Sequence, residues 1–75
     1  MKKKLSEMDY GERGTVTEIE KGLQKRVAGM GIRVGKNLRM VTKQPIKGPF
    51  DVVVDGAETS LGLDMAEKIT VEVTK

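Results

Sequence analysis

A short helix that ends at a glycine is expected near the middle of the chain. Leu23, Val27 and Met30 recur at positions i, i+4 and i+7, which places three apolar side chains on one stripe of a helix. Gly31 follows them, where helices commonly end in the left-handed conformation that glycine adopts without steric cost. Ile32 can then fold back as the hydrophobic contact beyond the helix end. Only one face of such a helix is buried, so any function is expected on its polar face.

The sequence on either side of this helix is typical of strands. Residues 69–73 alternate apolar and polar side chains and give the clearest strand prediction. In an earlier segment, Val16 and Ile19 break strict alternation, which predicts a bulge or a strong bend. The strands expected from these patterns cover residues 14–20, 38–42, 50–55 and 69–73.

Turns and one helical turn are expected between these strands. Gly35 predicts a turn before the strand that begins at about residue 38. Two prolines and a glycine within residues 44–49 predict a hairpin loop, because proline fixes the backbone and removes a donor. Residues 61–63 are expected to form a short strand, followed by a single helical turn over residues 64–68 with Asp64 as its N-cap.

Five short strands with one inserted helix favour a small closed sheet, because closure removes exposed edges. We therefore predict a mainly β, SH3-like barrel of about five strands. It has one short inserted α-helix and a short helical turn before the last strand. The expected core consists of Val16, Ile19, Leu23, Val27, Met30, Ile32, Leu38, Met40, Phe50, Val52, Val54, Leu63, Ala66, Ile69 and Val71.

Composition limits the classes of function open to the chain. Its 75 residues are enough for one small domain, expected over residues 5–75. The sequence has no cysteine and no histidine, so disulfides and thiolate or imidazole metal ligands are excluded, and neither a metal nor a cofactor is expected. The same shortage of general bases and nucleophiles argues against an enzyme.

The chain begins with a basic segment, residues 1–4, which contains three lysines. The residues that follow lack the apolar core of a signal peptide, and no stretch approaches the length of a membrane span. We expect residues 1–4 to form a frayed, solvated tail. We also expect a cytoplasmic protein that does not insert into a membrane.

The charges are segregated along the chain. The net charge is +3, and the three lysines at positions 2–4 account for all of it. Residues 21–50 hold eight cations and no acid, whereas both flanking segments are acidic. Two interpretations remain open: basic and acidic strands neutralise each other across the sheet, or the helix and following turn present a basic patch suited to an acidic protein surface or to phosphate.

An ordered set of residues runs through almost the whole chain. Its most specific parts are the pair Arg26 and Val27 before residues 30–32, the glycine beyond them, and the two prolines of the expected loop. The other members of the set are Leu5, Met8, residues 11–16, Gly22, Leu23, Ile46, Gly56, Leu61 and residues 66–69. In this order, the residues resemble the FeoA domain family.

This resemblance implies a small cytosolic SH3-like protein that accompanies FeoB, a ferrous iron transporter with a GTP-binding domain on its cytosolic side. FeoB would recruit the protein to the inner face of the membrane, and the protein would regulate or stabilise the transporter. The helix and the basic turn after it would contact the cytosolic GTP-binding region, while the oligomeric state is left open. The residues expected at that interface are Gln24, Lys25, Arg26, Arg33 and Lys36.

Three positions in this region need separate treatment. Arg26 has a structural alternative, in which its guanidinium caps carbonyl groups or pairs with a carboxylate such as that of Glu12. The sequence departs from the family pattern at Gly29, where a better helix former is common, and at Val34, where proline is frequent. Both departures fall where a partner would dock.

The alternative function is a small-barrel module that binds nucleic acid. The central cations would suit phosphate, but binders of single strands usually stack bases on aromatic side chains. This chain offers only Tyr10 and Phe50. The shortage of aromatic residues therefore favours the protein partner.

Overall fold

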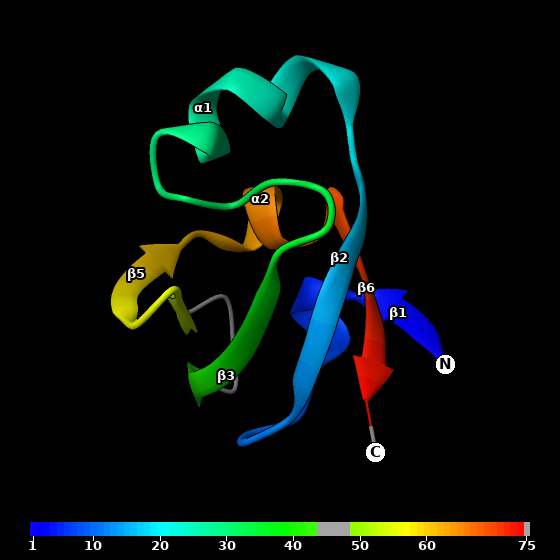
Figure 1. Cartoon of the computed structure of the whole chain (residues 1–75), viewed down its shortest axis with the longest axis vertical. Helices are drawn as coiled ribbons and strands as arrows, with labels where there is room; N and C mark the ends of the chain where they lie inside the picture. Colours follow the sequence, from blue (N-terminus) through cyan, green and yellow to red (C-terminus); the bar gives the residue numbers. More distant parts are fainter. Residues whose placement is uncertain (44–48, 75) are drawn as a thin grey trace.

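The computed structural model describes residues 1–43 and 49–74. The hairpin loop expected over residues 44–49 lies, except for its last residue, outside these described residues. The elements, in chain order, are β1 (Lys2–Lys4), the 3-10 helix η1 (Leu5–Glu7), β2 (Arg13–Ile19), the 3-10 helix η2 (Lys21–Leu23), α1 (Gln24–Ala28), β3 (Asn37–Lys43), β4 (Phe50–Val54), β5 (Ala57–Leu61), α2 (Leu63–Ala66) and β6 (Ile69–Thr74) (Figure 1).

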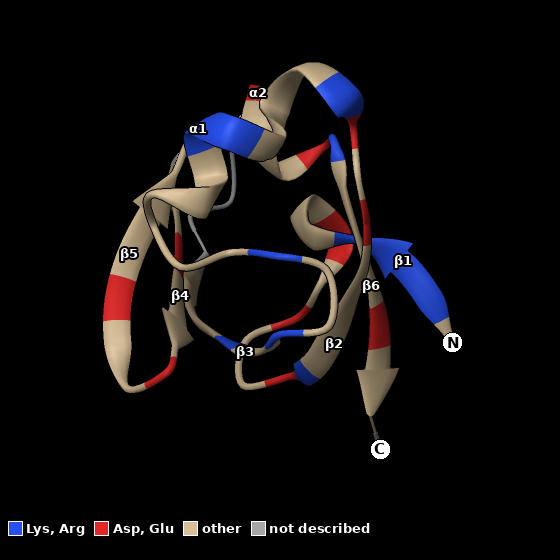
Figure 2. Ribbon diagram, turned by 45° about the horizontal axis from the view of Figure 1, so that its top comes forward, with Lys and Arg blue, Asp and Glu red and all other residues tan. Residues whose placement is uncertain are grey.

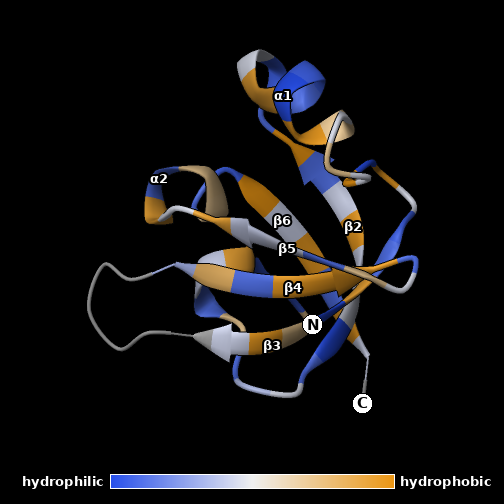
Figure 3. Ribbon diagram, turned by 90° about the vertical axis from the view of Figure 1, so that its left-hand side faces the viewer, coloured by the Kyte–Doolittle hydropathy of each residue, from blue (hydrophilic) through white to orange (hydrophobic). Residues whose placement is uncertain are grey.

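Six strands form one antiparallel sheet in the order β1-β6-β2-β3-β4-β5. The sheet curls strongly, and α1 lies at one end of the curl (Figure 3). The predicted mainly β, SH3-like fold with a short inserted helix and a helical turn before the last strand is confirmed. The strand count is six, because residues 2–4 add a strand that the sequence pattern did not indicate.

The core fills the inside of the curl and consists of apolar side chains. Leu5, Met8 and Leu61 belong to it although the sequence pattern did not select them, whereas Met30 and Leu63 are only partly buried and pack against it. Leu5 begins a single 3-10 turn and Met8 caps it, and one turn is too short to show a hydrophobic period. The buried apolar residues are Leu5, Met8, Val16, Ile19, Leu23, Val27, Ile32, Leu38, Met40, Phe50, Val52, Val54, Leu61, Ala66, Ile69 and Val71.

The expectation of a frayed tail over residues 1–4 is wrong. Lys2, Lys3 and Lys4 pair with Glu72, Val71 and Thr70 of β6 in an antiparallel ladder. Consecutive lysines have no strand period of their own, so the ladder depends on the β6 edge that the rest of the fold provides. Lysine side chains also suit an edge strand, because their charge discourages pairing with another chain.

Ion pairs hold this edge strand in place. The Lys3 ammonium lies 3.1 Å from a carboxylate oxygen of Glu12. The N-terminal ammonium of Met1 pairs with the exposed carboxylate of Glu72 and, by its hydrogen bond, holds the pKa of Glu72 below its usual range. The N-terminal segment is therefore part of the folded domain.

Two local predictions around the strands have different outcomes. The bulge expected in the first long strand is present, since the register of β2 against β6 shifts between Val16 and Glu18. The short strand expected over residues 61–63 is wrong, because β5 ends at Leu61. The N-cap of α2 is Gly62, and Asp64 lies inside the helix. Four helical residues leave little sequence from which to locate a cap.

Gly14 allows β2 and β6 to approach closely. It pairs with Val73 of β6 and with Leu38 of β3, so its backbone lies between two neighbours in the sheet. A Cβ atom at this position would lie 2.3 Å from the Cγ1 atom of Val71 and 2.7 Å from the carbonyl oxygen of Glu72. Because one of these atoms belongs to the backbone, the collision is not relieved by a side-chain rotation.

We expect Gly14→Ala to lower the free energy of unfolding by about 2 to 3 kcal/mol, the cost of overpacking a site that cannot relax. Gly22→Ala is the matched control, because its Cβ would meet no atom within 4 Å. Urea unfolding of both variants measures the difference. Equal stability of the two variants would show that the β2 and β6 backbones can separate without cost.

Deletion of residues 2–4 should lower the free energy of unfolding by about 2 kcal/mol, because it removes the ladder to β6 and the ion pair with Glu12. Replacing the three lysines by serine keeps the ladder and should cost less than the deletion. Thermal unfolding compares the two variants. A deletion variant as stable as the wild type would contradict a structural role for β1.

Candidate functional site

A groove lies between α1 and the loop that follows it. Its volume is about 360 Å³, and most of its wall is apolar. Basic residues lie on α1 and along the loop between α1 and β3 (Figure 2). We call this hollow the α1 groove; the residues that line it are Ile19, Gln24, Lys25, Ala28, Ile32, Arg33 and Val34.

The end of the helix sets one wall of the α1 groove. The Gly31 N–H donates to the carbonyl of Ala28 and the Ile32 N–H donates to the carbonyl of Val27, both at 3.0 Å. With Gly31 at φ +84°, these bonds have the pattern of a Schellman motif. The helix ends earlier than predicted, because α1 stops at Ala28 with Gly29 as its C-cap. The left-handed conformation of Gly31 and the burial of Ile32 are as predicted.

The loop after the helix is tied to β2. The Gly35 N–H donates to the carbonyl of Val16 at 2.8 Å, and the Val16 N–H donates to the carbonyl of Lys36 at 2.9 Å. The Lys36 N–H closes a turn on the carbonyl of Arg33 at 3.0 Å. These bonds hold Val34 at the groove, where its side chain is 59% exposed.

The structure brings together three of the five residues expected at an interface. Gln24, Lys25 and Arg33 line the α1 groove. The amide of Gln24 also donates to the carbonyl of Ile19 at 3.2 Å, which anchors it to the end of β2. Two cations from different segments therefore line the groove, one from α1 and one from the loop.

The other two expected residues lie outside the groove. Arg26 is exposed on α1 and makes no ion pair within residues 1–43 and 49–74. The carboxylate suggested for it, Glu12, binds the Lys3 ammonium and the Asp9 N–H. The Lys36 ammonium pairs with Asp55 at 2.9 Å, so its charge is partly neutralised.

Sequence reasoning placed Val34 where a partner would dock but did not predict the apolar wall around it. Val34 is one of the large hydrophobic residues that stay exposed, and Ile19, Ala28 and Ile32 complete the wall. The signal for Val34 was present, because an apolar residue between Arg33 and Gly35 falls in a turn, where nothing in the periodic pattern requires it. An apolar wall with cations at its rim can bind a partner.

Metal ligation and membrane spanning find no support in the part of the chain that the structure describes. No three carboxylates there are grouped closely enough to hold a metal ion. No helix in the described ranges has the length and apolar character needed to cross a bilayer.

The fold of this chain matches that of known proteins. A sequence model of the FeoA domain matches residues 3–73. The crystal structure of an iron uptake regulatory protein, FeoA, superimposes with a TM-score of 0.91 at 27% identity and covers 99% of both chains. The solution structure of FeoA from Chlorobium tepidum has a TM-score of 0.85 at 29% identity and covers 97% of this chain and 71% of that one.

A second class of protein contains the same fold. A manganese-dependent transcriptional repressor has a TM-score of 0.86 at 27% identity, and the match covers 93% of this chain but only 40% of the repressor. Among curated protein sequences, none matches the chain. Because the FeoA domain model covers nearly the whole sequence, the chain belongs to the FeoA domain family, which is associated with ferrous iron transport.

Proposed function

We propose that this chain is a cytoplasmic accessory protein of ferrous iron uptake that binds a FeoB-type transporter and regulates or stabilises it. The contact is made by the α1 groove with the cytosolic GTP-binding region of the transporter, which recruits the protein to the inner face of the membrane. Membership of the FeoA domain family supports the link to iron uptake. The main support for this contact surface is that Lys25 and Arg33 line the same apolar groove.

The groove combines two features that suit a protein partner. Val34 and the neighbouring apolar wall supply area that gains free energy when water is removed from it. The cations at the rim orient an acidic partner and speed the encounter, and they lose little when they stay partly solvated. The matching surface is an apolar side chain flanked by carboxylates.

The aromatic side chains do not suit the alternative of nucleic acid binding. Phe50 is buried in the core and is unable to stack on a base. Tyr10 is 78% exposed but lies in the turn before β2, and it does not line the α1 groove. Neither aromatic side chain is therefore placed to stack on a base at the α1 groove.

The double variant Lys25→Glu with Arg33→Glu should weaken binding to the cytosolic GTP-binding region of the transporter at least tenfold, which corresponds to about 1.4 kcal/mol. The reason is that both cations at the groove become repulsive to an acidic partner. Isothermal titration calorimetry measures the affinity, and thermal unfolding checks that the variant is folded.

The matched control carries Lys21→Glu and Arg26→Glu, which make the same charge change on neighbouring residues that do not line the groove. It should bind within about threefold of the wild type. Equal losses of affinity in the two double variants would show that net charge, and not the α1 groove, determines binding. Full affinity in Lys25→Glu with Arg33→Glu, or binding of a mixed-sequence oligonucleotide in its place, would contradict the proposal.

Val34→Ser should also weaken the complex, by about 1 kcal/mol, because it removes exposed apolar area from the groove without changing charge. The loss is expected in the dissociation rate, since charge steering is unaffected. Surface plasmon resonance separates the two rates. A change confined to the association rate would mean that the apolar wall is not buried in the complex.

A further inference from the structure

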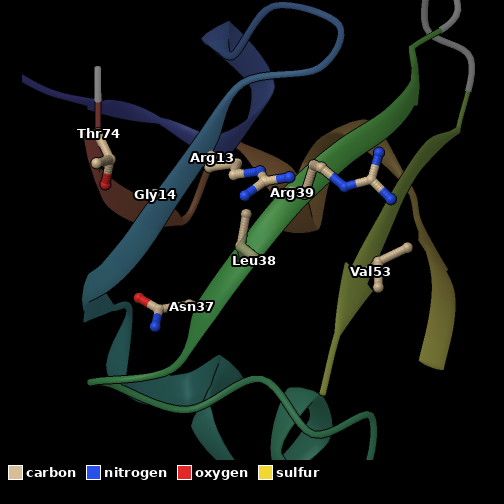
Figure 4. A pocket seen from close by; sticks show the side chains of 7 residues that line it. All are labelled: Arg13, Gly14, Asn37, Leu38, Arg39, Val53 and Thr74. Carbon is tan, nitrogen blue, oxygen red and sulfur yellow. The ribbon is translucent and has the colours of Figure 1, made fainter. Parts of the chain in front are cut away.

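A second hollow lies on the outer face of the sheet, away from the α1 groove. It has a volume of about 490 Å³ and is lined by side chains of β2, β3 and β4 and the end of β6. Figure 4 shows Arg13 and Arg39 beside it, together with Asn37, Leu38, Val53 and Thr74. We call it the sheet hollow, and neither the proposed function nor the sequence pattern uses it.

The pairing of the strands places two like charges opposite each other. Arg13 of β2 pairs directly with Arg39 of β3, a position at which like charges destabilise a sheet. Both side chains are exposed. Within the described residues, neither arginine forms an ion pair. The repulsion between the two arginines is therefore not relieved by an ion pair with any described residue.

The residues directly opposite the pair on the neighbouring strands are not acidic. On one side Arg13 pairs with Thr74 of β6, and on the other Arg39 pairs with Val53 of β4. Val53 separates Arg39 from the acid of the next strand, Glu58. The residues opposite one another across the sheet are therefore, in order, Thr74, Arg13, Arg39, Val53 and Glu58.

The two arginine side chains extend in the same direction across the sheet. In Figure 4, Arg13 extends from β2 toward β3, and Arg39 extends from β3 toward β4. The Asn37 Oδ1 atom accepts a hydrogen bond from the Thr15 hydroxyl at 2.6 Å, which leaves its Nδ2 group as a donor. A guanidinium presents a planar fork of N–H groups that matches the oxygens of phosphate.

We propose that the sheet hollow binds the phosphate group of a small organic phosphate monoester between Arg13 and Arg39. A monoester carries close to two negative charges at neutral pH, so it compensates both guanidiniums and removes their repulsion. The volume of about 490 Å³ exceeds what a phosphate group fills, and the organic part lies against Val53, which is only partly buried.

The test is a titration of the labelled protein with inorganic phosphate and with adenosine 5′-monophosphate, followed by amide chemical shifts at constant ionic strength. Saturable shifts should cluster on residues 13–15, 37–39 and 53, with a Kd below about 5 mM. Adenosine should give no such shifts. No saturation with either phosphate, or shifts spread over all basic residues, would overturn the proposal.

A pair of variants separates a built site from general positive charge. Arg13→Gln with Arg39→Gln should weaken phosphate binding at least tenfold, whereas Lys21→Gln with Arg26→Gln, which removes the same charge outside both hollows, should bind within twofold of the wild type. Phosphate should also raise the midpoint of thermal unfolding of the wild type above its value in chloride, and it should not do so for the first variant. Equal binding by the two variants would refute the site.

Discussion

The contact between β2 and β6 at Gly14 is the constraint on which the rest of the structure depends. β2 is the strand that joins the two halves of the sheet, since it pairs with β6 on one side and β3 on the other. At Gly14 the space that a side chain would need is filled by Val71 and by the backbone of Glu72. β2 contributes to both the α1 groove and the sheet hollow, because Ile19 lines the first and Arg13 lines the second.

Local patterns predicted the parts of the fold that depend on neighbouring residues. The left-handed Gly31 and the burial of Ile32 are set within a few residues of the helix end, and the structure confirms them. The predicted stripe is only partly present, because Val27 lies in α1, whereas Leu23 belongs to η2 and Met30 follows the helix. The strand β1 could not be predicted in this way, because its pairing depends on an edge of β6 nearly seventy residues away. The same reason explains why Leu5 was not assigned to the core.

The sequence predicted which residues belong to the candidate site but not which of them lie together. Lys25 and Arg26 are adjacent in sequence, yet successive residues of a helix point about 100° apart, and only Lys25 faces the groove. The pairing of Lys36 with Asp55 depends on how the turn after β4 meets the loop before β3. The opposition of Arg13 and Arg39 follows from strand register, which a single sequence does not specify.

The hydrogen bonds between Val16 and the loop at Gly35 and Lys36 have a consequence for how the α1 groove moves. They make the wall of the groove an extension of the central strand. The wall cannot swing open as an independent loop, because any such motion breaks pairing at the middle of the sheet. We therefore expect the amide hydrogens of Val16 and Gly35 to exchange with solvent only through openings that also disrupt β2, so the shape of the groove lasts as long as the fold itself.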